Sequence, residues 1–552
     1  MFLRALSPRA LSCAVLMALA TAASAQPAAS PGAAAPEQAV TSRADALPEQ
    51  LQDFRAYVDS VRKQFDVPGI AVAIVKDGKV VMEQGFGERE LGKPEPVDAR
   101  TMFAIASNTK AFTAAALQML AEQGKLKMDD RVIDHLPWFQ MSDPYVTREM
   151  RIRDLLAHRS GLGLGAGDLL YWPPTGYTTK EVVERLRDVP LATSFRSAYA
   201  YDNILFAVAT LVIEQVSGQT YADFLRTQIF KPVGMDDALV DSTYLKPGMN
   251  IAMGHAKFNF TELKPVPPMA WSNNPGAGGI YASVHDLAKW MNVQLAGGKL
   301  PDAGDGKEHR LFKEDSQKQM WSMLTPMKIG EPPVPELART KPNFAGYGEG
   351  WFLTDYQGQR LVWHTGGWPG MVSRLTLVPE LKLGIVVLTN QESGAAFNAV
   401  TYRVLDAYLG KTKTDWVAAY AAATKKAEGN ADDSWKKHEA ARNKGSKPSL
   451  PLAKYAGTYR DPWYGDIAIS QEGGKMRMKF SKTAQLVGTM EPWQNDSFVV
   501  RWDDRSLNAD AFVTFSLDAD GGIREVRMQP ISPMTDFSFD FQDLRLTPVK
   551  GS

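Results

Sequence analysis

The chain has 552 residues, of which 44% are hydrophobic and 22% charged, values that exclude wholesale disorder and a fibrous repeat. Lys and Arg number 62, and so do Asp and Glu, which argues against a protein that coats nucleic acid. The length predicts two or more domains, and the single cysteine, Cys13, excludes an intramolecular disulfide and a zinc–thiolate site.

The first 25 residues are predicted to be a secretory signal. Two arginines precede an apolar stretch, residues 11–23, and Ala23-Ser24-Ala25 fits the small-x-small rule of signal peptidase. The stretch is shorter than the ~20 residues that cross a bilayer. We therefore expect cleavage after Ala25, a periplasmic or secreted protein, and no membrane span.

The segment after the signal is expected to be a tether. Residues 26–46 are rich in Ala, Pro, Ser and Gln, which is typical of flexible chain. Apolar residues then recur at helical spacing from residue 51 to 65. Residues 70–75 are predicted to form a strand that turns at Asp77-Gly78 and returns as a hairpin.

Residues 47–410 are predicted to form one α/β (α+β) domain. From about residue 107 to 300 the pattern is mostly helical. The later expected elements are strands over 350–355, 360–365, 372–378 and 383–389, and a helix over 395–409. Because strands at both ends flank a helical middle, we predict an antiparallel sheet flanked by helices with an all-helical insert.

The C-terminal part changes character. Residues 411–450 are charged and Ala-rich, which indicates a partly helical linker. Residues 451–552 contain about eight short alternating segments, such as Met476, Met478 and Phe480, which predict a small antiparallel barrel or sandwich. Phe537, Phe539 and Phe541 alternate with polar residues in the same way.

Motif searches predict no metal and no cofactor. The seven histidines form neither H-x-H nor H-E-x-x-H, and no EF-hand or Walker loop is present. A G-x-S-x-G nucleophile elbow is also missing from the sequence.

The pattern Ser-x-x-Lys occurs three times, at Ser60, Ser107 and Ser434. Ser60 falls on the polar side of the first helix and Ser434 in the charged linker, where both are expected to be solvated. Ser107 follows an apolar run and opens a predicted helix, so Lys110 lies one turn further on the same face.

A helix N-terminus and a lysine suit a nucleophilic serine. The positive end of the helix dipole favours negative charge at Ser107, and a desolvated Lys110 can accept its proton. The alternative is an N-cap serine beside a surface lysine, and this segment alone does not decide between them.

Two further motifs favour the nucleophilic interpretation of Ser107. Tyr201-Asp202-Asn203 is the only Y-x-N, and His364-Thr365-Gly366 is the only [KH]-T-G. With Ser107-x-x-Lys110, their order resembles the penicillin-binding-protein and serine β-lactamase family, in particular the class C-related branch that includes esterases and D-aminopeptidases. The resemblance covers about residues 48–410, and residues 451–552 resemble the lipocalin-like module appended to some of these hydrolases.

The resemblance implies a role for each matched residue. Ser107 would be the acylated nucleophile, while Lys110 and Tyr201 share the proton that activates it and later leaves with the product. A phenol beside a lysine is expected to have a lowered pKa. The backbone N–H groups of Ser107 and Gly367 would form the oxyanion hole. The implied substrate-binding residues are Asn203, for which a helix cap is the alternative, and His364, Thr365 and Gly366.

His364 stands where lactamases usually have a lysine that binds the substrate carboxylate. A neutral histidine lowers the expectation of β-lactam hydrolysis and raises that of ester or peptide-amide substrates. Asp202 either favours a substrate amine or faces solvent. His158 and Arg159 form either part of an active-site rim or a buried structural pair, and the structural interpretation is favoured. The C-terminal module is expected either to cover the site or to mediate self-association.

We therefore predict an exported serine hydrolase that acts through a Ser107 ester on an ester or (D-)peptide amide. The alternatives are a class C-like β-lactamase and a non-catalytic protein that binds peptidoglycan or another ligand. The expected partners are small molecules, short peptides or peptidoglycan fragments, without nucleic acid.

Overall fold

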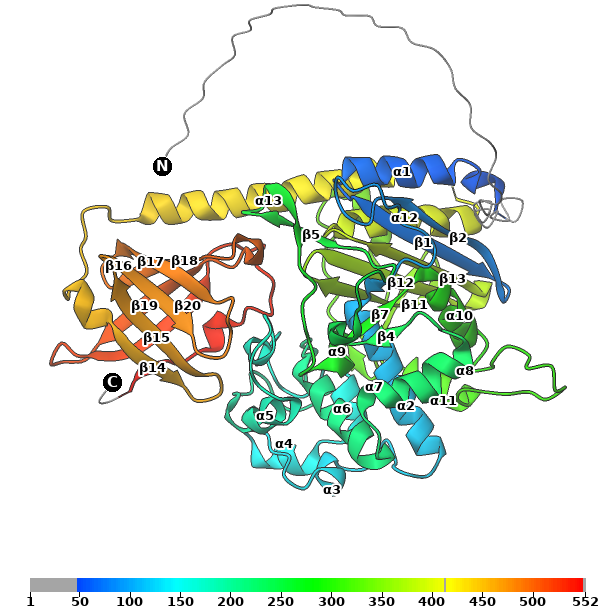
Figure 1. Cartoon of the computed structure of the whole chain (residues 1–552), viewed down its shortest axis with the longest axis horizontal. Helices are drawn as coiled ribbons and strands as arrows, with labels where there is room; N and C mark the ends of the chain where they lie inside the picture. Colours follow the sequence, from blue (N-terminus) through cyan, green and yellow to red (C-terminus); the bar gives the residue numbers. More distant parts are fainter. Residues whose placement is uncertain (1–46, 412–413, 550–552) are drawn as a thin grey trace, which may run out of the picture. The chain divides into compact units, whose positions relative to one another are not determined.

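The computed structural model describes residues 47–411 and 414–549 (Figure 1). The predicted signal, residues 1–25, and the predicted tether, residues 26–46, lie outside the described residues. Within the described part of the chain, none of the helices combines the length and the apolar character needed to cross a membrane.

An eight-stranded antiparallel sheet joins the two ends of the first domain. Its order is β2-β1-β13-β12-β11-β10-β9-β8. The bounds are β1 Gly69–Lys76, β2 Lys79–Gly87, β8 Thr325–Pro326, β9 Ala345–Tyr347, β10 Phe352–Tyr356, β11 Gln359–Trp368, β12 Met371–Val378 and β13 Leu383–Thr389. Strand β1 pairs with β13 from Ile70 opposite Thr389 to Lys76 opposite Leu383. The predicted hairpin and the four later strands are confirmed.

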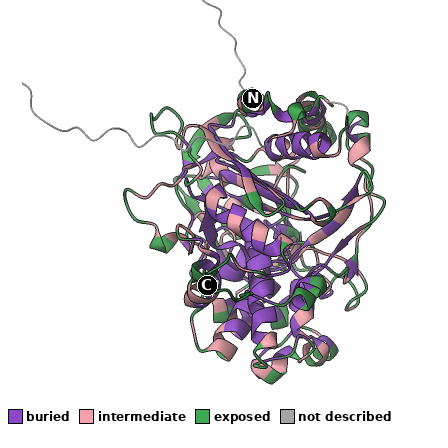
Figure 2. Cartoon of the chain, turned by 90° about the vertical axis from the view of Figure 1, so that its right-hand side faces the viewer, coloured by how far each residue is buried: buried purple, intermediate pink, exposed green. Residues whose placement is uncertain are grey.

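Both faces of this sheet are covered by helices, as Figure 1 shows. Ile70, Val72 and Ile74 pack in one core with α1 (Phe54–Gln64) and α12 (Gly394–Tyr408). Ala71, Ala73 and Val75 pack in the other core, because successive strand residues point to opposite faces. Burial on both sides explains why β1 is a continuous apolar run. Figure 2 shows buried residues both in the strands and in the helices of the fold.

The second core contains the helical insert, built around α2 (Thr109–Glu122), α6 (Ile204–Ser217) and α10 (Val284–Leu295). Helix α2 is buried on every side from Thr109 to Leu120. The shorter helices are α3 Val132–His135, α4 Pro144–Glu149, α5 Thr179–Glu184, α7 Tyr221–Leu225, α8 Lys231–Val233, α9 Pro275–Gly278 and α11 Glu314–Met320.

The insert also holds short strands that the sequence pattern did not indicate. Strands β3 (Phe103–Ala104), β7 (Ile280–Ala282) and β4 (Leu239–Val240) form a three-stranded sheet. Strands β5 (Gly254–Phe258) and β6 (Glu262–Val266) form a hairpin. Elements this short give too few residues for a readable alternation.

A single helix, α13 (Trp416–Ala441), occupies most of the segment predicted as a linker. Only its first turns are buried, at Trp416, Ala419 and Tyr420. The indole Nε1 of Trp416 donates to a carboxylate oxygen of the buried Asp406 at 3.0 Å. Tyr356 donates its hydroxyl to the other oxygen at 2.7 Å, so this carboxylate ties α13 to α12 and β10.

The C-terminal domain is the barrel that the alternating pattern predicted. Its eight strands are β14 Gly457–Asp461, β15 Gly465–Glu472, β16 Lys475–Phe480, β17 Val487–Gln494, β18 Ser497–Trp502, β19 Ala511–Leu517, β20 Ile523–Pro530 and β21 Thr547–Pro548. They follow the order β20-β19-β18-β17-β16-β15-β14-β21, and a bridge between Val526 and Leu546 brings the two sheet ends together. Met476, Met478 and Phe480 point inward and are buried. Residues 537–540, however, form a loop rather than the expected strand.

We predict that Trp416→Ala lowers the free energy of unfolding of the first domain by about 3–5 kcal/mol, because it empties a fully buried site. Equilibrium urea unfolding followed by circular dichroism measures the change. Trp435→Ala, on the same helix but only half-buried, is the matched control and should cost clearly less. Equal losses for both variants would contradict this account of how α13 is held.

Candidate active site

Ser107 lies in a tight turn between β3 and α2. Ala106, just before it, has φ of 47°, a left-handed conformation that is uncommon for residues other than glycine. The hydroxyl of Ser373 on β12 donates to the carbonyl of Ile105 at 2.8 Å and accepts from the Asn108 amide at 2.8 Å. These bonds hold the turn against the sheet, while Ser107 itself stays only half-buried.

Lys110 is fully buried, and its Nζ has three partners. It lies 2.9 Å from Ser107 Oγ, 2.8 Å from Asn203 Oδ1 and 2.9 Å from the carbonyl oxygen of Ala277. Two of these partners can only accept, so they take the two N–H bonds of a neutral amine. The nitrogen lone pair is then left to accept the Ser107 hydroxyl proton.

Burial also favours that neutral amine. It lowers the pKa of Lys110 to about 7, although the carboxylates of Asp168 and Asp202 act in the opposite direction. Near neutral pH a substantial fraction of Lys110 therefore lacks its proton and can act as a base.

Tyr201 completes the group around Ser107. Lys110 Nζ is 4.9 Å from the centroid of the Tyr201 ring, and the phenol is hydrogen-bonded to Ser107. Burial raises the pKa of Tyr201 well above its usual value, only partly opposed by that hydrogen bond. The expectation of a lowered phenol pKa is wrong, because desolvation outweighs the nearby lysine. The Tyr201 phenol therefore keeps its proton at neutral pH.

Asn203 directly precedes α6 but makes no side-chain capping bond. Its amide oxygen accepts from Lys110, and its amide nitrogen donates to Asp168 Oδ2 at 2.9 Å. The side chain therefore bridges two buried ionisable groups, and the helix-cap alternative does not describe it.

The second half of β11 borders the Ser107 turn. Strand β10 pairs with β11 only as far as Trp363, so residues 364–368 pair with β12 alone. A Cβ on Gly366 would lie 2.2 Å from the carbonyl oxygen of Ile105, so only glycine permits this approach. Thr365 is half-buried and Gly367 exposed on the same edge. The oxyanion hole of Ser107 and Gly367 N–H groups stays a prediction.

His364 faces the protein interior. Its Nδ1 donates to the carbonyl of Thr365 at 2.6 Å, which leaves Nε2 to accept from the Tyr347 hydroxyl at 2.8 Å. Burial, with Lys110 nearby, lowers the pKa of His364 well below its usual value. The ring is neutral with both nitrogens engaged, so it offers no cation to a substrate carboxylate.

The neighbouring polar residues have structural partners. Arg159 donates to the carboxylate of Asp154 at 2.8 Å. Asp202 is fully buried, accepts from Ser160 Oγ at 2.7 Å, and donates its backbone N–H to His158 Nδ1 at 3.1 Å. Asp202 therefore does not face solvent, and its carboxylate is engaged within the protein rather than exposed to a substrate amine.

Asp168 is a site residue that sequence reasoning missed. Its buried carboxylate accepts from Asn203, from the Tyr171 hydroxyl, and from Ser538 Oγ at 2.7 Å. Burial raises the pKa of Asp168 to about 7, against the effect of these donors. A lone acid in a Gly-rich loop belongs to no motif, so no pattern in the sequence could have found it.

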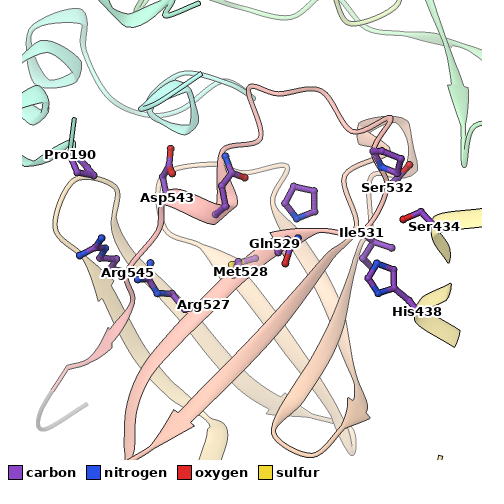
Figure 3. Close-up of a pocket in the computed structure, with 13 residues that line it drawn as sticks. Pro190, Ser434, His438, Arg527, Met528, Gln529, Ile531, Ser532, Asp543 and Arg545 are labelled. Carbon is purple, nitrogen blue, oxygen red and sulfur yellow. The ribbon is translucent and has the colours of Figure 1, made fainter. Parts of the chain in front are cut away.

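The other two Ser-x-x-Lys matches lie elsewhere. Ser60 is exposed on α1. Ser434 on α13 lines an open pocket of about 710 Å³ with His438 and the barrel residues Arg527 and Asp543 (Figure 3). Among the described residues no cluster of His, Cys, Asp and Glu suits a metal ion.

Comparison with known proteins agrees with this arrangement. The unguisins hydrolase ungD' of Aspergillus campestris is 27% identical over 507 residues, which cover 85% of this chain and 88% of that protein. The protein flp of Staphylococcus aureus is 29% identical over 338 residues, which cover 59% of this chain and 60% of that protein.

Solved structures show the same fold. The penicillin-binding protein homologue from Pyrococcus abyssi superposes with a TM-score of 0.56 at 21% identity, over 90% of this chain and 99% of that one. The D-amino acid amidase from Ochrobactrum anthropi superposes with a TM-score of 0.51 at 23% identity, over 64% of this chain and 98% of that one.

Family models match both domains. A model described as a domain of unknown function, DUF3471, matches residues 441–548, which span the barrel. The model described as Beta-lactamase matches residues 54–409, more than half of the chain and all the residues grouped around Ser107. The chain belongs to the β-lactamase family of serine hydrolases.

Proposed function

We propose that this protein is an exported serine hydrolase that forms an acyl-enzyme at Ser107 and acts on ester or (D-)peptide amide substrates. One observation carries the proposal: the amine of Lys110 is fully buried, and its Nζ lies 2.9 Å from Ser107 Oγ. A serine becomes an effective nucleophile when a positioned base takes its proton.

The first half of the reaction follows from this geometry. Ser107 Oγ attacks the substrate carbonyl while its proton passes to Lys110 Nζ. The developing oxyanion would be stabilised by the N–H groups of Ser107 and Gly367. When the intermediate collapses, Tyr201 gives its proton to the departing amine or alcohol, and the proton held by Lys110 restores the phenol.

The second half uses the same groups in reverse. A water molecule replaces the leaving group, Lys110 accepts its proton through Tyr201, and the hydroxide attacks the Ser107 ester. Release of the carboxylic acid returns the proton to Ser107 Oγ. A phenol that stays protonated in the free enzyme suits amide substrates, because an amine leaves only after protonation.

The character of His364 indicates the substrate class. Its neutral, fully engaged ring supports substrates without a carboxylate at the position next to β11. The names of the unguisins hydrolase and the D-amino acid amidase support an amide or peptide. Thr365 and Gly366 on the same edge are proposed to align the substrate backbone.

Two alternatives rank lower. A class C-like β-lactamase would retain a partner for the substrate carboxylate, which His364 does not provide. A non-catalytic peptidoglycan- or ligand-binding protein is disfavoured because Ser107, Lys110 and Tyr201 are all in mutual contact. Export, the last part of the proposal, is supported by the pattern in residues 1–25 and tested by sequencing the mature N-terminus, expected at Gln26.

We expect a fluorophosphonate probe to label Ser107, because the probe traps serines activated by a base. Mass spectrometry of the digested protein locates the adduct, and Ser107→Ala should abolish both labelling and turnover of a chromogenic ester. Ser60→Ala and Ser434→Ala serve as controls and should behave like the parent protein. Labelling at either control serine would overturn the assignment of the nucleophile.

We expect kcat/KM to rise about tenfold per pH unit below a bend near pH 7, because the reactive form of Lys110 is the neutral one. The profile should level above the bend. A profile without a bend near pH 7 would contradict the role of Lys110 as the base.

We expect a neutral substrate to be preferred over its carboxylate counterpart. A D-amino acid anilide and the same anilide carrying a carboxylate differ only in the group for which His364 lacks a cation. The neutral compound should have a kcat/KM about 10–100 times higher, which corresponds to one missing charged hydrogen bond. Faster hydrolysis of the carboxylate compound or of a cephalosporin would favour the β-lactamase alternative.

A further inference from the structure

A loop of the barrel domain lies against the catalytic group. Asp540 is fully buried, and its carboxylate accepts from the backbone N–H of Gly167 at 2.6 Å and of Leu169 at 3.2 Å. These two residues flank Asp168. The barrel loop is thus hydrogen-bonded to the backbone on both sides of Asp168, the residue that contacts Asn203.

The same loop also reaches the Asp168 side chain. Ser538 Oγ donates to Asp168 Oδ2 at 2.7 Å, and Asn203 Nδ2 donates to that same oxygen at 2.9 Å. Asn203 Oδ1 in turn accepts from Lys110. A continuous chain of buried hydrogen bonds therefore runs from the barrel domain to the proposed base.

A second contact joins the barrel loop to the residues around Ser107. The ring of Phe537 meets the ring of Tyr201 edge-on, with centroids 5.8 Å apart. A Cβ on Gly165 would lie 2.7 Å from the carbonyl oxygen of Phe537, so the two loops touch through their backbones. A pocket of about 370 Å³ lined by Gly163, Leu164 and Phe537 lies beside this contact.

We infer that the barrel domain completes the active site, with Ser538 as a positioning residue that fixes Asp168 and, through it, Asn203 and Lys110. The inference rests on the proposed function, because it assigns Ser538 an effect on the base of that reaction. An amide side chain such as Asn203 has two orientations, and the Asp168 oxygen selects the one that turns Oδ1 toward Lys110. Ser538 holds that oxygen in place.

Loss of the Ser538 hydroxyl leaves the Asp168 oxygen with one donor fewer in a buried site, where unmade hydrogen bonds matter most. Asn203 and Lys110 are then held less firmly, and the proton transfer from Ser107 slows. The barrel interface keeps the two Asp540 contacts, so the domain should stay docked.

The test is the rate at which a fluorophosphonate inactivates the full-length protein, because that rate reports the activation of Ser107 for any natural substrate. We expect Ser538→Ala to lower it about tenfold and to lower kcat for a chromogenic ester by a similar factor, with KM changed less than about twofold. Ser538→Thr keeps the hydroxyl and should restore the rate. Ser532→Ala, in the same loop but without a contact to Asp168, is the matched control.

The outcomes separate the two proposals. If the parent protein is not labelled at Ser107, the proposed function fails. If it is labelled and Ser538→Ala reacts at the parental rate, only the positioning role fails. A parallel fall in Ser538→Ala and Ser532→Ala, or a fall that Ser538→Thr does not reverse, likewise contradicts it. Should Ser538→Ala lower the melting temperature markedly, Asp540→Asn, which removes one acceptor beside Asp168, provides the second variant and should slow labelling to a smaller degree.

Discussion

The burial of one amine organises this site. Lys110 has no exposed surface, and the cost of keeping a charge there brings its pKa close to neutrality. The neighbours of Lys110 suit a neutral amine. Asn203 and the Ala277 carbonyl accept its two N–H bonds, and its lone pair can then accept the proton of Ser107. Tyr201 and His364, both desolvated by the same environment, stay in their neutral forms. Desolvation thus determines the protonation states of Lys110, Tyr201 and His364 around Ser107.

The large-scale fold could be predicted because its elements carry strong periodic signals. The core sheet and its covering helices come from long apolar runs, and the barrel from regular alternation. The short strands β3, β4 and β7 are too brief to show a period, and α2 lacks a polar face because it lies in the middle of the domain. Residues 537–540 alternate like a strand, yet Ser538 and Asp540 point across to another loop instead of entering a ladder.

Some residues of the site could be identified from the sequence and others could not. Ser107 and Lys110 are three residues apart at the start of a helix, so their spacing alone predicts that they meet. Tyr201 and Asn203 lie on another element and were found only because the order of the motifs resembles that of a known family. Asp168 and Ser373 could not be found, since their roles arise only when distant loops fold together. The pKa of Tyr201 was predicted in the wrong direction, because a sequence shows which charges are near but not how much water is excluded.

The position of β1 between β2 and β13 has a consequence for how the molecule is made. Strand β1 begins at Gly69, but its partner β13 ends only at Thr389, so the sheet forms through contacts between residues far apart along the chain. Such long-range pairing slows folding. A ribosome must release nearly the whole first domain before the hairpin of β1 and β2 finds its neighbour. Until then, one long apolar edge is open to misassembly, and this interval is where chaperone binding would matter most.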